Sequence, residues 1–158
     1  MGKYNLDMEA RADMARAFFK KGYNCCQSVA LAYSDIIGMD EDSIAALASG
    51  FGGGFGRMRE VCGCVSGMTM VAGAVLPSTD PSDMQRRGAN YDLVQKLGNK
   101  YKEQNGSIIC RELLGMAKSK ETESPMPSAR TSEYYGKRPC PELCACAARI
   151  LAETLNEF

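Results

Sequence analysis

The sequence contains no histidine and no tryptophan. Without histidine, neither a Ser-His nor a Cys-His catalytic pair can operate, and no imidazole can bind a metal ion. Acid–base chemistry and metal ligation therefore fall to cysteine, aspartate, glutamate, lysine or tyrosine. Without tryptophan, the chain also lacks the strongest aromatic platform for stacking a base or a sugar.

The chain carries no net charge, because 19 lysine and arginine residues balance 19 aspartate and glutamate residues. The basic residues are scattered, so we expect no basic surface that would attract nucleic acid or an anionic membrane. The uncharged run 61–76 is too short to span a bilayer, which takes about 20 residues. The sequence thus predicts neither nucleic-acid binding nor membrane insertion.

The ends of the chain lack targeting signals. No apolar segment typical of a secretory signal follows Met1, and neither end carries a lipidation motif. We therefore expect a cytoplasmic protein. In a reducing compartment, many cysteines indicate metal binding or redox chemistry more often than structural disulfides.

Helical periodicity runs through nearly the whole chain. Caps and helix-breaking residues divide it into expected helices at 7–21, 24–37, 40–49, 61–76, 80–105 and 141–155, with a short turn at 110–115. A glycine-rich loop at 50–56 precedes a buried central helix, and the polar segment 116–139 is expected to be a long loop. The sequence predicts an all-α protein, an irregular or orthogonal bundle of about six helices, in a single domain over residues 1–158.

Cysteine is the over-represented residue, with eight in the chain: Cys25, Cys26, Cys62, Cys64, Cys110, Cys140, Cys144 and Cys146. A buried cysteine can serve merely as a small apolar side chain, but eight together favour redox or metal chemistry. No Cys-x-x-Cys occurs, so neither a thioredoxin-type site nor a zinc ribbon fits the spacing.

Four of the cysteines fall at predicted helix N-termini: Cys25, Cys62, Cys110 and Cys140. Unpaired backbone N–H groups and the helix dipole favour a thiolate there, and they lower the pKa of a thiol from about 8.5. The same groups would stabilise an anionic metal–thiolate cluster. The four sulfurs can converge only if the bundle brings these helix ends together.

The other cysteines are expected to have lesser roles. Cys26, Cys64 and Cys144 neighbour the candidate ligands and are expected to be resolving thiols or substitute ligands. In the last helix, Cys140 and Cys144 share a face, whereas Cys146 lies about 120° around the helix from Cys140. We therefore expect Cys146 to be a filler or a spare thiol.

The glycine-rich segment 50–56 could in principle cradle a phosphate. However, no strand precedes it and no Gly-Lys-Ser/Thr follows it, which disfavours a phosphate-binding loop. A loop that lets the backbone approach a cluster or the central helix is the favoured interpretation. Arg57 and Arg59 beside it are expected to lie on a solvated rim, with screening of thiolate charge as the alternative.

Several of these motifs occur in one order that resembles a known family. They are Gly22–Cys25, Gly50–Arg57, Cys62–Gly67, Gly106–Gly115 and Cys140. Together they resemble the C_GCAxxG_C_C family of redox-active proteins over roughly residues 8–155. The resemblance implies that Cys25, Cys62, Cys110 and Cys140 are the hallmark cysteines.

A related cysteine-rich domain occurs in split-Soret cytochromes, where similar cysteines are associated with an iron–sulfur centre. The resemblance therefore implies an iron–sulfur site in this chain. The family pattern Cys-Gly-Ala-x-x-Gly is replaced here by Cys62-Gly63-Cys64, which leaves open whether Cys62 or Cys64 is the ligand. No Cys-x-x-Cys-His occurs, so the chain is not itself a c-type cytochrome.

Three hypotheses follow. The leading one is a redox or electron-transfer protein that binds an iron–sulfur cluster, with the 2Fe-2S type favoured, through the four hallmark thiolates. The alternative is a metal-free thiol–disulfide oxidoreductase, in which thiols such as Cys62 and Cys64 attack and resolve. The third is a structural zinc–thiolate site. The sequence does not identify the redox partner protein, and it is compatible with a homodimer.

Overall fold

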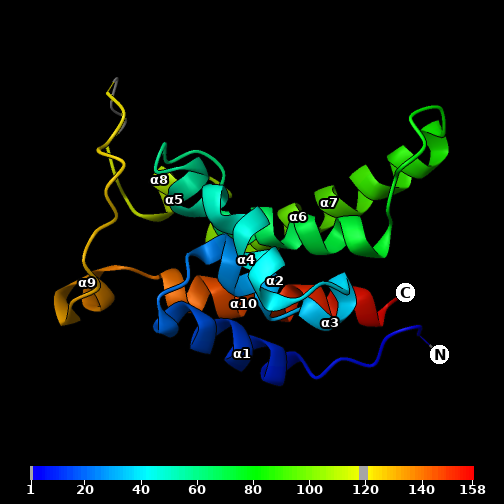
Figure 1. The fold of residues 1–158 in the computed structure, drawn as a ribbon, viewed down its shortest axis with the longest axis horizontal. Helices are drawn as coiled ribbons and strands as arrows, with labels where there is room; N and C mark the ends of the chain where they lie inside the picture. The colour runs from blue at the N-terminus through cyan, green and yellow to red at the C-terminus, as the bar shows by residue number, and fades with distance from the viewer. Residues whose placement is uncertain (1, 118–120) are drawn as a thin grey trace.

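The computed structural model describes residues 2–117 and 121–158, which form an all-α bundle, as predicted. Helices α1 (Met8–Lys21) and α10 (Cys140–Asn156) pack along each other in opposite directions (Figure 1). The two ends of the chain meet beside this pair, where the backbone N–H of Lys3 donates to the carbonyl oxygen of Phe158 at 2.8 Å. The pair α1/α10 thus forms one side of the bundle.

Side-chain caps begin three helices where the sequence indicates. Asp7 caps α1, Asn24 caps α2 (Cys25–Leu31) in a reciprocal capping box with Gln27, and Asp40 caps α4 (Glu41–Ala48). Each capping side chain accepts a backbone N–H that has no partner within the helix. These boundaries are local properties of the sequence.

The expected helix 24–37 is divided in the structure. After α2, Tyr33 has a non-helical backbone conformation, and the short helix α3 (Ser34–Ile37) follows. The Tyr33 side chain is fully buried, and its hydroxyl donates to the carbonyl oxygen of Ala148 at 2.6 Å. The division therefore coincides with a tertiary contact that local periodicity does not reveal.

The uncharged segment forms the buried helix α6 (Gly63–Val75), and α7 (Met84–Asn105) runs back along it (Figure 1). The predicted start of α7 near Asp80 is wrong by a few residues. The Asp80 carboxylate accepts from the backbone N–H and the hydroxyl of Ser82, which closes a turn. Asp83 caps the helix instead by accepting from the N–H of Arg86 at 2.9 Å.

The predicted glycine-rich loop at 50–56 is not confirmed as an irregular loop. It forms a 3-10 turn, η1 (Ser49–Phe51), and a short helical turn, α5 (Gly52–Phe55), which packs close to α8 (Cys110–Leu113). Inside α5, Gly53 and Gly54 have φ values of +67° and +68°, in the left-handed region. Glycine adopts this conformation without steric cost, which explains why the segment is rich in glycine.

The predicted long loop, 116–139, contains one further helix. Residues 118–120 of this loop lie outside the described residues. Farther along, Thr131 caps α9 (Ser132–Lys137) by accepting from the N–H of Tyr134, and α10 begins shortly after. The second half of the loop thus leads directly to the helix that carries Cys140.

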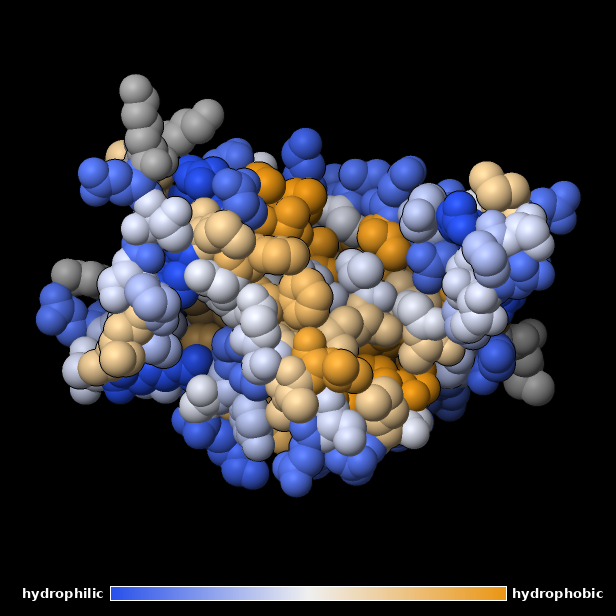
Figure 2. Space-filling view, turned by 45° about the horizontal axis from the view of Figure 1, so that its top comes forward, coloured by the Kyte–Doolittle hydropathy of each residue, from blue (hydrophilic) through white to orange (hydrophobic). Residues whose placement is uncertain are grey.

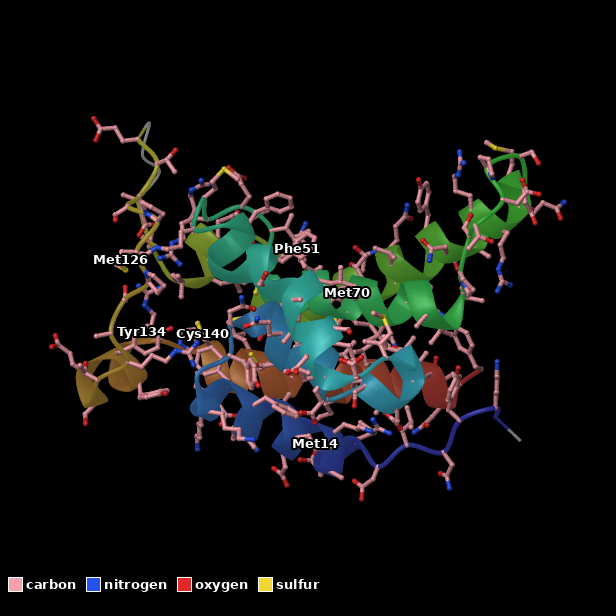
Figure 3. All side chains as sticks on the ribbon, viewed as in Figure 1. Met14, Phe51, Met70, Met126, Tyr134 and Cys140 are labelled. Atoms are coloured by element: carbon pink, nitrogen blue, oxygen red, sulfur yellow. The ribbon has the colours of Figure 1, made fainter. Side chains whose placement is uncertain are left out.

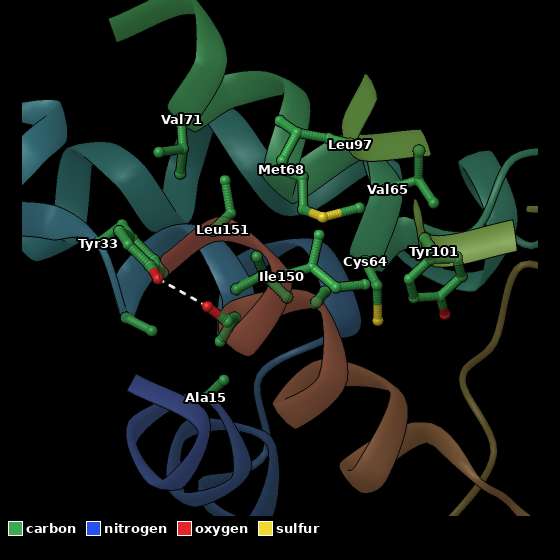
Figure 4. Close-up of a cluster of buried hydrophobic side chains, with 14 of the residues drawn as sticks. Ala15, Tyr33, Cys64, Val65, Met68, Val71, Leu97, Tyr101, Ile150 and Leu151 are labelled. Carbon is green, nitrogen blue, oxygen red and sulfur yellow. Dashed lines mark hydrogen bonds between the residues drawn. The ribbon is translucent and has the colours of Figure 1, made fainter. Parts of the chain in front are cut away.

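One continuous core cluster draws on α1, α2, α6, α7 and α10. Figure 4 shows part of it, including Met68 and Leu151 and the hydrogen bond of Tyr33. Cys64 and Tyr101 belong to the same cluster and are fully buried. The inner side of the candidate site is therefore part of the core, whereas Cys25 and Cys140 are partly exposed.

Apolar surface is not confined to the interior. Figure 2 shows apolar side chains gathered across the middle of one face. Large exposed apolar side chains include Leu47, Phe55 and Met58. None of the described helices combines the length and apolar character that crossing a bilayer requires.

Candidate thiol centre

The four hallmark cysteines stand at helix starts, as predicted. Cys25, Cys110 and Cys140 are the first residues of α2, α8 and α10, and Cys62 is the residue that precedes α6. All four line a single cavity of about 70 Å³. In Figure 3, Cys140 lies at the start of α10, with Tyr134 of α9 close by. The fold thus brings together thiols that lie far apart in the sequence.

Backbone hydrogen bonds hold two of these helix starts side by side. The N–H of Cys62 donates to the carbonyl oxygen of Ile108 at 2.8 Å, and the N–H of Cys110 donates to that of Glu60 at 2.7 Å. An isolated β-bridge between Val61 and Ile109 lies between these bonds. This pairing places the starts of α6 and α8 at the same cavity.

Glycines form part of the cavity wall because a side chain would not fit. A Cβ atom at Gly54 would lie 2.5 Å from Cβ of Cys110, and one at Gly63 would lie 3.1 Å from Cβ of Cys25. Both contacts are closer than ordinary van der Waals separation. The interpretation that the glycine-rich segment lets the backbone approach the site is consistent with these distances.

Two further thiols lie behind the cavity. The Sγ atoms of Cys64 and Cys144 are 3.6 Å apart, and both residues are fully buried. With the Sγ of Cys25 they form a group whose sulfur atoms all lie within 4.8 Å of one another, close enough to hold a metal ion. Cys25 is thus shared between the cavity and this inner group.

Two of the cavity thiols, Cys25 and Cys62, have lowered pKa values. Hydrogen bonds from the thiols of Cys140, Cys144 and Cys64 hold the pKa of Cys25 well below its ordinary value, against the opposing effect of burial. The pKa of Cys62 is also lowered, chiefly by a hydrogen bond from Cys64. Donors that point at a thiolate favour the charged form.

The neighbouring thiols have raised pKa values. The hydrogen bond to Cys144 is the main cause for Cys64, and burial is the main cause for Cys144. The pKa of Cys110 is raised by burial, and that of Cys140 chiefly because its proton bonds the Cys25 sulfur. The expectation that every helix-start thiol has a lowered pKa is therefore wrong for Cys110 and Cys140, since burial and competition for protons outweigh the helix terminus.

Arginine side chains flank the cavity. Arg59 and Arg130 both line it, and Nη1 of Arg59 lies 3.7 Å from Sγ of Cys110. Arg130 stacks on the ring of Phe19 at 3.9 Å from its centroid, and its charge helps to lower the pKa of Cys25. These two guanidinium groups can offset negative charge on thiolates or on a metal–thiolate cluster.

The expected solvated rim at Arg57 and Arg59 is wrong. Their side chains are only 17% and 11% exposed, because both bind the carboxylate of Glu123 from the long loop. The bond from Arg59 lowers the pKa of Glu123 to about 2. Beside Cys110, the charge of Arg59 opposes the rise in the pKa of this thiol that burial causes.

Tyr101 completes the inner side of the centre. Its hydroxyl lies 3.3 Å from Sγ of Cys62, and the residue is fully buried. Burial raises the pKa of Tyr101, so the phenol keeps its proton. Because the pKa of Cys62 is lowered, the phenol is the donor and the sulfur is the acceptor.

Two cysteines lie outside the centre. Cys26, expected to be a resolving thiol, is buried with its Sγ 3.7 Å from Sδ of Met70, and burial raises its pKa to about 12. Cys146 lies on another face of α10, where it contacts Gln104 and Asn105 of α7. Its position away from Cys140 and Cys144 agrees with the helical spacing.

Sequence reasoning identified the cavity cysteines but missed several of their neighbours. One feature of the sequence points to the contact between Cys64 and Cys144. Because Cys140 and Cys144 are four residues apart in a helix, Cys144 is expected on the face that carries Cys140. Nothing local to the sequence indicates that Tyr101 or Arg130 reaches the centre, because both contacts join residues far apart in the chain.

Comparison with known proteins identifies a family that is named for its cysteines. The family model described as "Putative redox-active protein (C_GCAxxG_C_C)" matches residues 23–154, which include every cysteine of the chain. No curated protein and no solved structure matches the chain. Because the family match covers most of the sequence, the chain belongs to the C_GCAxxG_C_C family of redox-active proteins.

Proposed function

We propose that this protein transfers electrons through an iron–sulfur cluster, of the 2Fe-2S type, bound by Cys25, Cys62, Cys110 and Cys140. The observation that carries the proposal is the convergence of these four thiols, from four separate helix starts, on one cavity. Four cysteine thiolates are the usual ligand set of such a cluster.

The residues around the cavity fit such a group. The donors are sulfur atoms, which iron–sulfur clusters require, and glycine backbone at positions 54 and 63 leaves room beside them. A cluster held by four thiolates is negatively charged, and Arg59 and Arg130 supply positive charge at the cavity. Support for iron over zinc comes from the family, whose members are described as redox-active.

The proposal takes Cys62, not Cys64, as the ligand from this motif. Cys62 lines the cavity, whereas Cys64 is directed at Cys144 behind it. When bound, the cluster would supply one-electron transfer at iron. Tyr101 would then donate a hydrogen bond to a ligand sulfur, and such bonds tune the reduction potential of the centre.

The test is metal and sulfide analysis of the full chain, purified without oxygen and reconstituted with iron and sulfide. We expect a brown protein with iron and acid-labile sulfide in equal amounts, and a reversible one-electron reduction. The matched control is Cys146→Ser, which removes a thiol from the same helix as Cys140 but outside the cavity.

Two results would contradict the proposal. Colourless, iron-free protein after reconstitution would exclude a cluster at these thiols. Stoichiometric zinc in protein from iron-rich, zinc-poor growth would favour a structural zinc site, since zinc is redox-inert.

A further inference from the structure

The two cysteines behind the cavity are not needed as cluster ligands in the proposal above. Cys64 comes from α6 and Cys144 from α10, two helices that pack directly against each other in the core. Both side chains are inaccessible to solvent, and their sulfur atoms are 3.6 Å apart. A disulfide has an S–S distance of about 2.05 Å, so the two sulfurs need to approach by only about 1.5 Å.

We propose that Cys64 and Cys144 form a second, two-electron redox couple, a buried dithiol that becomes a disulfide by exchange with a small disulfide compound. This inference concerns the metal-free chain, because its entry thiol, Cys25, is also a ligand in the iron–sulfur proposal. The pair that becomes oxidised, Cys64 and Cys144, is not part of that ligand set. It assigns this protein an activity in addition to electron transfer at the cavity.

Cys25 is the route from solvent to the buried pair. Among the described residues, the cavity lining includes Cys25 but neither Cys64 nor Cys144. The Sγ of Cys25 nevertheless lies within 4.8 Å of both. A small disulfide can therefore reach Cys25 from the cavity, and Cys25 can pass the oxidation inward.

The exchange balances in three steps. The Cys25 thiolate attacks one sulfur of the disulfide RSSR, forms a mixed disulfide and releases one thiolate RS⁻. The Cys144 sulfur then attacks the Cys25 sulfur and releases the second RS⁻, giving a Cys25–Cys144 disulfide. Finally, the Cys64 sulfur attacks the Cys144 sulfur and returns Cys25 as a thiolate. The protons of Cys64 and Cys144 go to the two released RS⁻ groups, so RSSR and two protein thiols yield two RSH and one disulfide.

The direction of the last step follows from packing. A Cys64–Cys144 disulfide leaves Cys25, the first residue of α2, free at the cavity. It also joins two helices that already contact each other, so little backbone movement is required. The oxidised pair would consequently be compatible with the native fold.

The experiment uses the full chain, stripped of metal by a chelator, fully reduced, and then exposed to oxidised glutathione without oxygen. Peptide mapping by mass spectrometry identifies the disulfide. We expect the loss of two thiols per chain, a mass decrease of about 2 Da, and a linked peptide pair carrying Cys64 and Cys144. Cys146→Ser is the matched control and should give the same product at the same rate.

Three variants test the route. Cys64→Ala should stop at a Cys25–Cys144 disulfide, and Cys144→Ala should stop with glutathione on Cys25 or with Cys25 joined to Cys64. Cys25→Ser should form the Cys64–Cys144 bond at least about tenfold more slowly, because the entry thiol is gone. Far-UV circular dichroism of each variant verifies that it is folded.

The proposal is overturned if Cys64 and Cys144 both remain available for alkylation after oxidation and denaturation. It is equally overturned if the stable product joins Cys25 to Cys140 or to Cys62. Unchanged kinetics in Cys25→Ser would reject the entry route. Iron binding in Cys64→Ala is a separate readout, so failure of either proposal is distinguishable from failure of the other.

Discussion

The substitution Gly54→Ala tests whether the glycine-rich turn exists to bring backbone against Cys110. Gly54 has a φ of +68°, and an alanine in this left-handed conformation costs about 1–2 kcal/mol. Its Cβ would also lie 2.5 Å from Cβ of Cys110, 2.8 Å from Cα of Arg59 and 2.9 Å from N of Glu60. Two of these neighbours are backbone atoms that cannot rotate away, and such overpacking costs about 1–3 kcal/mol more.

We therefore expect Gly54→Ala to lower the free energy of unfolding by about 2–5 kcal/mol. Cys110 should move away from the cavity, so the variant should also bind less iron on reconstitution. The measurements are urea unfolding of the metal-free protein, followed by circular dichroism, and the iron content after reconstitution.

Gly56→Ala provides the matched control. Gly56 has a similar φ of +59°, but the nearest atom to an added Cβ is the carbonyl oxygen of Gly50 at 3.8 Å. This variant should lose only about 1–2 kcal/mol and should bind iron normally. Equal destabilisation and equal iron content in the two variants would refute the argument that the turn is built around Cys110.

Two further predictions concern the centre itself, and a third concerns the ion pairs of Glu123 beside it. Cys146→Ser should keep the full metal content, whereas serine at any one cavity thiol should abolish metal binding, as measured by iron analysis of the variants at Cys25, Cys62, Cys110 and Cys140. Tyr101→Phe should keep the metal but make the reduction potential more negative in a redox titration, because the ligand sulfur loses a hydrogen-bond donor; an unchanged potential would contradict this. The pKa of Glu123 is lowered to about 2, so its ion pairs stabilise the fold above the ordinary value of 4.5, and this stabilisation is lost as the pH falls from there through 2. The stability difference between the wild type and Glu123→Gln in urea unfolding should accordingly shrink across that range, and a constant difference would count against the ion pairs.

The helix boundaries were predictable where the signal is local. Asp7, Asn24 and Asp40 cap helices through their own side chains, and Gly106 ends α7 in a left-handed conformation. The predicted start of α7 at Asp80 failed because a neighbouring aspartate three residues later offers an equally good cap. Sequence alone does not rank two adjacent caps whose choice depends on where the helix must pack.

The composition limits which side chains of this protein can bind a metal ion or carry redox chemistry. The absence of histidine left thiols as the metal-ligating soft donors. Asn24 caps the helix that begins at Cys25, and Pro141 stands in the first turn of the helix that begins at Cys140. Each of these properties depends on residues within one turn of the cysteine concerned. The sequence by itself therefore fixed which thiols stand at helix starts and that the protein is helical.

Only the tertiary structure decided which thiols meet. Cys64 touches Cys144, Tyr101 reaches Cys62, and Arg59 approaches Cys110 across long stretches of chain. These contacts depend on the packing of whole helices. The same packing buries Cys110, and burial raises the pKa of its thiol against the opposing effect of Arg59. Local sequence sets the conformation of a residue, whereas the low-dielectric surroundings that govern its charge come from segments that only the fold brings near.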